Sequence, residues 1–551
     1  MKPEEFSSPG ALPSASRRTF LKTGLTAGGA LLLGFRLKAI DGATAPATTF
    51  APDAFIRIDP SGAVTLIMPQ VEMGQGVYTS IPMIIAEELD AKWDSVRVDH
   101  APPSDALYGN PTFKEQMTGN SNSIRAFWMP LRKSSAAARA MLVEAAAKRW
   151  KVDASTCATV DGEVVHAASN RRLGYGELVA DASRVEAPKD PPLKDVKDFR
   201  LIGKPLKRLD TPDKTNGKAQ YGIDAMPEGL KFATLRACPV FGGKVAHVDD
   251  AKAKQVPGVR QVVVLDDLVA VVGDHMWAAK QGLDALDIAW NDGEHANVTT
   301  DAIWTKLRAA SENEGLVAKT EGDFAKGAGE GEKIDAAYEM PLLAHATMEP
   351  LNCTVHVTAD SCEVWLGTQV IARAQKAAAK LAGLPLEKVT VHNHVLGGGF
   401  GRRLETDYVE KAVRIAQKVD GPVKVVYTRE EDIRQDIYRP AYRDVMSASL
   451  ANGRIVAWRH RVTGSSVMAR FLPPLFEMTK HIDIDGVDSA VDEPYDIANL
   501  RVEFMRDEPI HVPTGFWRGV GPNNNVFAVE SFVDELAKKA GKDPVEFRRG
   551  M

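Results

Sequence analysis

The chain has 551 residues, of which 44% are hydrophobic and 26% charged, and its formal net charge is −5 from 68 basic and 73 acidic side chains. This length accommodates two to four globular domains. The balanced charge, with no basic stripe interleaved with aromatic residues, argues against nucleic acid as the main partner. The four cysteines, Cys157, Cys238, Cys353 and Cys362, are widely scattered and form no C-x-x-C pair. The chain itself therefore lacks the thiolate spacing of an iron–sulfur cluster or a zinc ribbon, and four free thiols are the simplest interpretation.

Residues 1–50 are predicted to be an export signal and linker. Arg17 and Arg18 precede a short apolar run from about Gly24 to Phe35, and Ala45–Ala47 offers a small-residue cleavage site. The run is too short to cross a hydrocarbon core about 30 Å thick. The pattern is typical of the twin-arginine route, which exports folded proteins to the periplasm, and so it favours a cofactor inserted before export. A chance pair of arginines and an uncleaved signal that anchors the chain to a membrane are the alternatives.

The segment 51–199 is predicted to be mixed α/β. Apolar residues at helical spacing predict a helix over about 78–90, and an alanine-rich run predicts another over 134–149. Strands are expected at 64–68 and near 96–98, and a hairpin around 161–162. Two loops of this segment are rich in glycine and small polar residues; they contain Gly74, Gln75 and Gly76 in one case and Gly119, Asn120 and Ser121 in the other.

The remainder is predicted to hold two further α/β segments, which gives an α+β, or mixed α/β, fold class for the whole chain. Residues 200–292 contain strand patterns and one helix pattern, and are expected to form a small separate domain. Residues 293–334 are rich in Gly, Glu, Lys and Ala and are expected to be a surface connection. A larger α/β domain is expected over 335–551.

The stretch Gly397-Gly398-Gly399-Phe400-Gly401 follows a predicted strand over 389–391 and precedes a helical pattern. Glycine at this density costs backbone entropy, so such a loop is expected where unusual dihedral angles or a close approach are required. The loop lacks the Gly-Lys-[Ser/Thr] of a P-loop, and no acidic ribose-binding residue follows it. A bulky anionic cofactor bound by main-chain N–H groups and a tight strand-to-helix turn both fit this pattern.

Four other segments accompany the glycine loop: Met73–Gly76, His345–Asn352, Trp365–Gln369 and Phe516–Asn523. Together the five resemble the large, molybdenum-binding subunits of the xanthine dehydrogenase and aldehyde oxidase superfamily, and within it the isoquinoline 1-oxidoreductase β-subunit type. The resemblance covers nearly the whole chain from about residue 55. It makes 335–551 a molybdopterin-binding domain and 200–292 the small, hammerhead-like aldehyde-oxidase domain. The Met-Gly-Gln-Gly loop comes first here but downstream in xanthine dehydrogenases, so 51–199 looks like a permuted molybdopterin-binding segment.

The resemblance implies a molybdopterin cofactor that carries molybdenum, expected in its cytosine dinucleotide form. A pterin with a pyrophosphate and a nucleotide needs many N–H and amide donors. Gln369 is expected to donate a hydrogen bond to a metal oxo group, and Arg518 to offer its guanidinium to an oxyanion or to the cofactor. No side chain is expected to ligate the metal directly. The expected cofactor contacts are Gly74, Gln75, Gly76, Gly119, Asn120, Ser121, Gln369, Gly398, Gly399, Phe400, Gly401, Arg518 and Gly519.

Each assignment has a structural alternative. Gln369 could cap the helix that follows it, Arg518 could pair with a surface carboxylate, and the loop 119–121 could be a solvated turn. His392 and His394 share one face of a strand, but no third ligand supports zinc, and residues on the polar face of a strand are the preferred interpretation.

His345 and Glu349 are expected to make structural hydrogen bonds rather than to take part in catalysis. Members of the family use a glutamate in a Gly-x-Gly-Glu setting near their C-terminus as the general base, and no such motif lies within the expected C-terminal domain, 335–551. The resemblance therefore suggests a C-terminally truncated member or one part of a split protein, and no catalytic base is assigned.

The resulting hypothesis is the large subunit of an exported molybdenum hydroxylase. Its substrate is expected to be an aldehyde or an N-heteroaromatic compound, oxidised with oxygen derived from water. Because the chain lacks cysteine clusters, electrons are expected to pass to a small partner subunit with 2Fe–2S clusters, and from there to a cytochrome c. The alternatives are a non-catalytic fragment that binds the cofactor or the partner, and an exported solute-binding protein.

Overall fold

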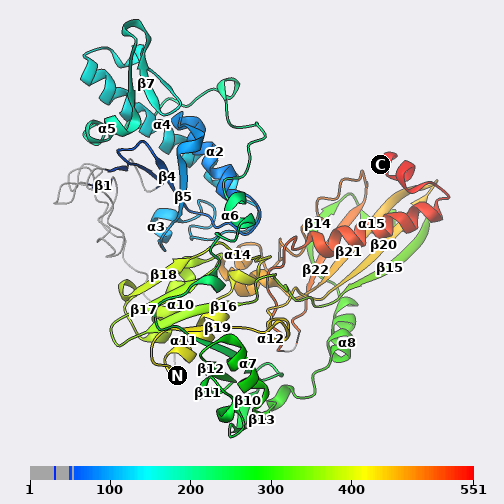
Figure 1. Ribbon diagram of the computed structural model, residues 1–551. Helices are drawn as coiled ribbons and strands as arrows, with labels where there is room; N and C mark the ends of the chain where they lie inside the picture. Colours follow the sequence, from blue (N-terminus) through cyan, green and yellow to red (C-terminus); the bar gives the residue numbers. More distant parts are fainter. Residues whose placement is uncertain (1–29, 33–48, 52–54, 510) are drawn as a thin grey trace, which may run out of the picture. The chain divides into compact units, whose positions relative to one another are not determined.

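The computed structural model describes residues 30–32, 49–51, 55–509 and 511–551. The twin-arginine pair, the expected cleavage site and most of the apolar run lie outside these residues. The chain divides into two compact units, 1–219 and 220–551 (Figure 1). Among the described residues, no helix combines the length and apolar content needed to cross a membrane.

Unit 1 is built on a five-stranded sheet with strands in sequence order. Helix α2 (Val77–Leu89) buries Ile81, Ile84 and Ile85 at helical spacing, as predicted. The alanine-rich helix is longer than expected: α4 (Ser123–Trp150) begins before residue 134 and includes Pro130. The sheet strands are β1 (Ala30–Leu32), β2 (Thr49–Ala51), β3 (Ile56–Ile58), β4 (Val64–Met68) and β5 (Val96–His100). A three-stranded antiparallel sheet follows, made of β6 (Ala158–Val160), β7 (Glu163–His166) and β8 (Arg171–Gly174), and then helix α5 (Tyr175–Ala182).

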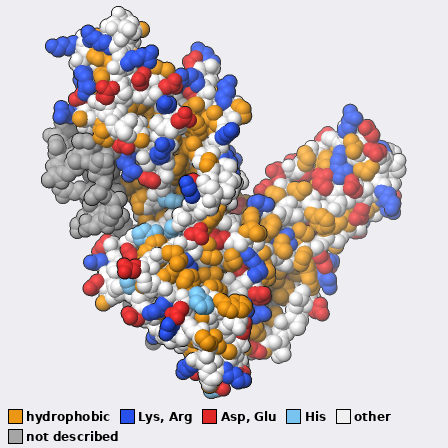
Figure 2. All heavy atoms as spheres, viewed as in Figure 1, with side chains coloured by type: hydrophobic (Ala, Val, Ile, Leu, Met, Phe, Trp, Pro, Cys, Tyr) orange, Lys and Arg blue, Asp and Glu red, His pale blue; other side chains and the backbone are white. Residues whose placement is uncertain are grey.

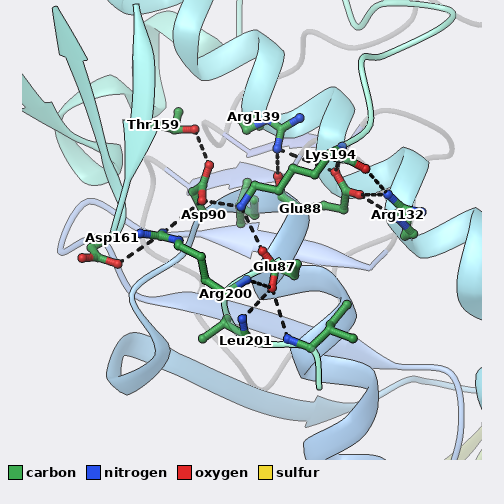
Figure 3. A network of polar contacts seen from close by, with 12 residues as sticks. Glu87, Glu88, Asp90, Arg132, Arg139, Thr159, Asp161, Lys194, Arg200 and Leu201 are labelled. Carbon is green, nitrogen blue, oxygen red and sulfur yellow. Dashed lines mark hydrogen bonds and ion pairs between the residues drawn. The ribbon is translucent and has the colours of Figure 1, made fainter. Parts of the chain in front are cut away.

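Within unit 1, buried carboxylates at the carboxyl end of α2 bind the segment 192–202 (Figure 3). The Glu87 carboxylate accepts backbone N–H groups of Arg200, Leu201 and Ile202 at 2.8, 2.6 and 3.1 Å, and the Lys194 ammonium at 3.0 Å. Burial by itself would raise the pKa of Glu87, but the hydrogen bonds from Leu201 and Lys194 outweigh it and lower this pKa. A single carboxylate thus satisfies four donors of a segment whose only regular structure is a short 3₁₀ turn over Val196–Asp198.

Two neighbouring carboxylates extend this network (Figure 3). Glu88 accepts a hydrogen bond from Arg132 at 2.7 Å, and Asp90 accepts one from Thr159 at 2.6 Å and one from Lys194 at 2.5 Å. Because buried ionised groups are costly unless paired, the network explains how three acidic residues lie so close together within unit 1.

Unit 2 contains two large sheets. The first has the order β11–β12–β9–β19–β16–β17–β18 and the second β14–β22–β21–β20–β15, while β10 and β13 form a separate pair. The first sheet consists of β9 (Lys231–Ala237), β11 (Val259–Val264), β12 (Leu268–Gly273), β16 (Asn352–Val357), β17 (Cys362–Leu366), β18 (Val389–Asn393) and β19 (Val423–Val426). The second consists of β14 (Leu316–Glu321), β15 (Glu332–Met340), β20 (Tyr442–Ala451), β21 (Arg454–Gly464) and β22 (Leu500–Arg506); the pair is β10 (Lys244–Asp249) and β13 (Asp287–Asn291).

Helices flank both sheets. Helices α10 (Ile371–Ala382) and α11 (Asp407–Ala416) pack on the first sheet, where Tyr408 and Val409 join its apolar core. Helix α15 (Pro522–Lys539) packs on the second sheet, with Phe532 against Trp458. The other helices of unit 2 of five residues or more are α7 (Met276–Asp284), α8 (Thr300–Ser311), α12 (Arg429–Arg434), α13 (Val467–Phe471), α14 (Pro473–Met478) and α16 (Pro544–Arg549). On the face seen in Figure 2, basic and acidic side chains are interspersed over both units, in keeping with the near-balanced charge.

The domain limits expected from the sequence differ from this organisation. The unit boundary falls at residue 219 rather than 199. Strand β9 of the expected small domain pairs in parallel with β19, through Lys231 and Val423, so strands from 231–273 and 352–426 share one sheet. The expected surface connection 293–334 contains helix α8 and strand β14, which pairs with β22. Pairing between residues so far apart in sequence leaves no signal in local composition.

Candidate cofactor site

Two parallel strands of the first sheet in unit 2 position the candidate residues. Strand β17 pairs in parallel with β18, with Leu366 opposite Asn393. The carboxyl ends of parallel strands meet at one edge of a sheet, where ligands of α/β proteins commonly bind. The turn that carries Gln369 follows β17 and the glycine loop follows β18, so the structure brings these two sequence motifs to the same edge.

The glycine loop uses its carbonyl groups and leaves its amides free. Each carbonyl from Gly397 to Gly401 accepts a hydrogen bond. None of the N–H groups from Gly398 to Gly401 donates one to any described residue. Gly398, Phe400 and Gly401 have positive φ values of 104°, 55° and 111°, and backbone segments that contain such residues can form anion-binding concavities from their N–H groups. A row of free amides of this kind is suited to bind an anion or a metal oxo group.

Glu349 is the acceptor that holds the loop in place. Its buried carboxylate accepts N–H groups of Gly397 and Ile223 at 2.8 and 3.0 Å, the Asn352 amide at 2.9 Å and the Arg403 guanidinium at 3.0 Å. A Cβ at Gly397 would lie 2.3 Å from the Glu349 Cβ, so only glycine fits there. The prediction that Glu349 has a structural role is confirmed.

The two arginines that end the loop are structural as well. Arg403 is fully buried and donates to the carbonyls of Gly398, Gly367 and Glu349. Arg402 pairs with Asp407 through two bonds of 2.7 and 2.8 Å. Neither cation is available to a ligand, although two arginines beside a glycine loop would suggest it.

Gln369 is 4% exposed and lies directly beside the loop, since its backbone N–H donates to the Arg403 carbonyl at 2.9 Å. Helix α10 takes Val370 as its N-cap residue, and the side chain of this residue makes no capping bond. The sequence could not reveal that Gln369 is fastened to the end of the glycine loop, because the two are 34 residues apart in the chain.

Arg518 also contacts the glycine loop. Its N–H donates to the Phe400 carbonyl at 2.7 Å, and its guanidinium lies 5.0 Å from the centre of the Phe400 ring. The alternative of a surface ion pair is not observed, since no carboxylate of the described residues pairs with Arg518. Its side chain is exposed and therefore free to bind an anion. Asn523, in the first turn of α15, donates to the Arg518 carbonyl at 3.1 Å and fixes the turn at Gly519.

His345 links the segment that contains Phe516 to the end of the glycine loop, through Asp436. Its Nε2 donates to the Phe516 carbonyl at 2.9 Å, and its Nδ1 lies 3.1 Å from the Asp436 carboxylate. The same carboxylate pairs with Arg402 at 2.7 Å. The predicted structural role of His345 is confirmed, and Asp436, which the sequence analysis missed, is the shared anchor.

The candidate residues of unit 1 behave differently. The N–H groups of Gly74 and Gly76 donate to the Glu72 carboxylate at 2.8 and 3.1 Å, and Arg208 neutralises this carboxylate at 2.9 Å. Gln75 is exposed, but its amide is folded back onto the Val71 carbonyl at 2.9 Å. The amides of this loop are thus already occupied, and a role in cofactor binding stays a prediction.

The second loop of unit 1 presents Asn120 and Ser121 to solvent, both with left-handed φ values of 52° and 48°. It is fastened to the end of β4: Thr118 accepts from the Val71 N–H at 3.0 Å, and Gln70 donates to the Met117 carbonyl at 3.1 Å. Strained exposed residues on a well-anchored loop are compatible with both a ligand contact and a solvated turn.

His392 stacks on Trp365 with ring centres 4.9 Å apart and its Nε2 lies 3.9 Å from Glu363. Burial lowers the pKa of His392 and of His394. His392 is thus a partly buried residue of a strand face, as the sequence analysis preferred.

Comparison with known protein families adds to this geometry. Residues 32–226 and 309–550 match two models, each described as a molybdopterin cofactor-binding domain. The fold and these matches define a molybdopterin-binding chain. It is 33% identical to isoquinoline 1-oxidoreductase subunit beta of Brevundimonas diminuta over 97% of this chain and 74% of that protein. It is 31% identical to the membrane-bound aldehyde dehydrogenase (pyrroloquinoline-quinone) of Gluconacetobacter polyoxogenes, over 97% of this chain and 72% of that protein.

The chain belongs to the xanthine dehydrogenase family of molybdenum-dependent oxidoreductases, as its resemblance to the isoquinoline 1-oxidoreductase β-subunit type implied. Its fold is that of the family's large subunits, as in quinoline 2-oxidoreductase from Pseudomonas putida 86. That structure aligns with a TM-score of 0.50 at 18% identity over 63% of this chain, and the chain spans half of its length. The predicted family and fold class are confirmed.

Proposed function

We propose that this chain is the large subunit of a molybdenum hydroxylase that oxidises an aldehyde or an N-heteroaromatic compound with oxygen derived from water. The aldehyde and N-heterocycle classes are those in the names of its two relatives. The cofactor is proposed to be the cytosine dinucleotide form of molybdopterin. When bound, this cofactor supplies two-electron redox chemistry at molybdenum.

The observation that carries the proposal is the row of free N–H groups from Gly398 to Gly401, with Arg518 beside it. No acceptor among the described residues competes for these amides. Four convergent donors and an unpaired guanidinium fit a group with oxo and phosphate oxygens. The exposed Arg518 would hold an oxyanion by charge-assisted hydrogen bonds, and Gln369 would donate from its side-chain amide without adding charge.

The described residues also indicate how the site is kept rigid. Glu349, Arg403 and Asp436 fix the glycine loop and its neighbours from beneath, so that the free amides are held in place before any ligand arrives. A site organised in advance loses little conformational entropy when it binds. No proton-transfer role is assigned to any residue of the described chain.

Electron transfer is proposed to require a second polypeptide. Three of the four cysteines are buried, and burial raises the pKa of Cys362 to about 11, so its thiol is protonated at neutral pH. The spacing of the four cysteines along the chain does not match that of iron–sulfur cluster ligands. A small subunit with 2Fe–2S clusters, followed by a cytochrome c, is the proposed acceptor chain. We also propose that the protein is exported to the periplasm by the twin-arginine route. An uncleaved signal would anchor it to the membrane.

The test is the cofactor content of the purified chain. We expect about one molybdenum per chain and release of CMP on hydrolysis of the cofactor. Arg518→Ala should lower both about tenfold, because a charge-assisted hydrogen bond contributes about 1.5–3 kcal/mol. The matched control is Arg171→Ala, at an exposed arginine of β8 whose sheet carries none of the candidate residues.

Equal molybdenum in Arg518→Ala and Arg171→Ala would refute the assignment of Arg518. A wild-type chain without molybdenum would refute the proposed function. A chain that holds the cofactor but shows no turnover with its iron–sulfur partner would instead support the cofactor-binding fragment.

A further inference from the structure

A second group of ligating side chains in unit 2 lies outside the motifs discussed above. It consists of Glu294, His295 and His511, each of which offers one ligand atom within 4.8 Å of the other two. Glu294 and His295 lie in a short turn just after β13, and His511 lies beyond the end of β22. The cluster therefore joins two segments that are more than 200 residues apart in the chain.

The two imidazole rings are unusually close. Their centres are 3.4 Å apart with an angle of 40° between the planes, whereas aromatic pairs usually lie about 4.5–7 Å apart. His295 Nε2 is shielded from solvent and makes no hydrogen bond to the described residues. The Glu294 carboxylate lies 3.1 Å from this nitrogen, although the alignment is unsuitable for a hydrogen bond. A ring nitrogen that is shielded from solvent and makes no hydrogen bond is costly, so the arrangement favours a further atom among the three groups.

The donor set indicates which atom this is. Two imidazoles and one carboxylate suit zinc or another late first-row transition ion, whereas calcium and magnesium prefer oxygen ligands. Zn–N and Zn–O distances of about 2.0–2.2 Å place ligand atoms roughly 3.3–3.5 Å apart in a tetrahedral site. The three ligand atoms lie within 4.8 Å of one another, so they would have to approach by roughly 1 Å to reach that geometry.

The backbone around His511 is consistent with a role for its side chain. His511 has a left-handed φ of 53°, a conformation that non-glycine residues adopt at a cost of about 1 kcal/mol or more. The chain is fastened on both sides of it: Asp507 pairs with Lys306 at 2.8 Å, and the Pro513 carbonyl accepts the Tyr438 N–H at 2.9 Å. Described residues on both sides of His511 are thus fixed by contacts with other elements of unit 2, and its ring lies against that of His295.

We propose that Glu294, His295 and His511 form a binding site for a single zinc ion or a similar transition-metal ion, with the fourth ligand supplied by water. The bound ion would fasten the turn at His511 to the turn after β13. It is distinct from the molybdenum cofactor, and its binding does not depend on the proposed redox function.

The test is titration of the untagged full-length chain, freed of loosely bound metal by a chelator, with Zn²⁺ alone against a chromophoric competitor. We expect one Zn²⁺ per chain. His295→Ala and His511→Ala should each weaken binding at least about tenfold, because each removes one of three protein ligands. Glu294→Gln should also weaken binding, but by less. The amide oxygen that replaces the carboxylate can still bind the ion, although it is a poorer ligand. His247→Ala is the matched control, an exposed histidine on β10 outside the cluster, and should bind as wild type does.

A second readout guards against misfolded variants. Zn²⁺ should raise the melting temperature of wild type and of His247→Ala but not of His511→Ala, because a ligand stabilises only the state that binds it. The proposal is overturned if wild type binds no Zn²⁺, or if His511→Ala binds as tightly as wild type. It is equally overturned if His247→Ala loses binding to the same extent. Molybdenum content is measured separately, so failure of the proposed function would not affect this result.

Discussion

Gly401→Ala is the sharpest test of how the glycine loop is built. A Cβ at residue 401 would lie 1.8 Å from the Phe516 carbonyl oxygen, about 1.6 Å closer than ordinary van der Waals contact. The residue also has a φ of 111°, which L-residues rarely adopt. The obstacle is backbone rather than a flexible side chain, so the two loops must separate.

The cost follows from the bonds that separation breaks. Phe516 accepts from His345 at 2.9 Å, and Arg518 donates to Phe400 at 2.7 Å. Each lost hydrogen bond costs about 0.5–1.5 kcal/mol, and leaving the buried His345 nitrogen unpaired raises one of these to about 1–3 kcal/mol. Positive φ at alanine adds about 1–2 kcal/mol. We therefore expect a total destabilisation of about 3–6 kcal/mol, concentrated at the loop.

Gly421→Ala is the control that separates the cost of a positive φ from the cost of the steric clash. Gly421 has a φ of 75° in the same unit, and nothing lies within 4 Å of its Cβ position, so only the backbone term of about 1–2 kcal/mol applies. Both variants should be compared by urea denaturation and by molybdenum content after expression in a host that makes the cofactor. Gly401→Ala should lose most of its molybdenum, whereas Gly421→Ala should keep it. If the two variants match in stability and in metal content, the close approach of the loops has no part in cofactor binding.

Two further predictions concern buried carboxylates. Glu87→Gln removes the ion pair with Lys194 and weakens three charge-assisted bonds, so it should destabilise unit 1 by about 2–3 kcal/mol and speed amide exchange over 194–202, with peptides of unit 2 as the internal control. Because the pKa of Glu87 is lowered on folding, its contribution is present above the unfolded pKa of about 4.3 and is lost as the pH falls through the folded value; a difference in amide protection between wild type and Glu87→Gln that does not shrink on acidification, after correction for the intrinsic pH dependence of exchange, would contradict this. Asp485, between α14 and β22, has its pKa raised to about 6 by burial and by the charges of Asp483 and Asp488. Its ionised form thus costs stability above pH 6, and this cost disappears as the pH falls from about 6 to about 4. Asp485→Asn should stabilise the chain by about 2–3 kcal/mol at pH 7.5 and by much less near pH 4, as measured by urea denaturation at both values; equal gains at the two values would refute the assignment.

Local patterns were enough to predict the elements around the site. The periodicity of Ile81, Ile84 and Ile85 predicted α2, and the alternating segment before Gly397 predicted β18. The glycine density of 397–401 predicted left-handed and crowded backbone, which the structure shows at Gly398 and Gly401. Motifs of this kind carry their own geometry, because few backbone conformations fit such residues.

The groups that hold the site together could not be predicted in the same way. Glu349 reaches Ile223, Gly397 and Arg403, residues 48 to 126 positions away, and Asp436 joins His345 to Arg402. A buried carboxylate has no local pattern that distinguishes it from an exposed one. The same holds for β9, whose pairing with β19 joins segments nearly 200 residues apart into one sheet.

The two glycine-rich loops show why a motif alone does not define a ligand site. In the loop at Gly74 and Gly76, the buried carboxylate of Glu72 accepts the amides and thereby occupies the place that an anion would take. In the loop at 398–401, the carboxylate of Glu349 binds one residue earlier, at Gly397, and leaves the following four amides without an acceptor in the described chain. Because unpaired amides gain most from an added anion, a ligand contact is favoured at the second loop and needs a rearrangement at the first.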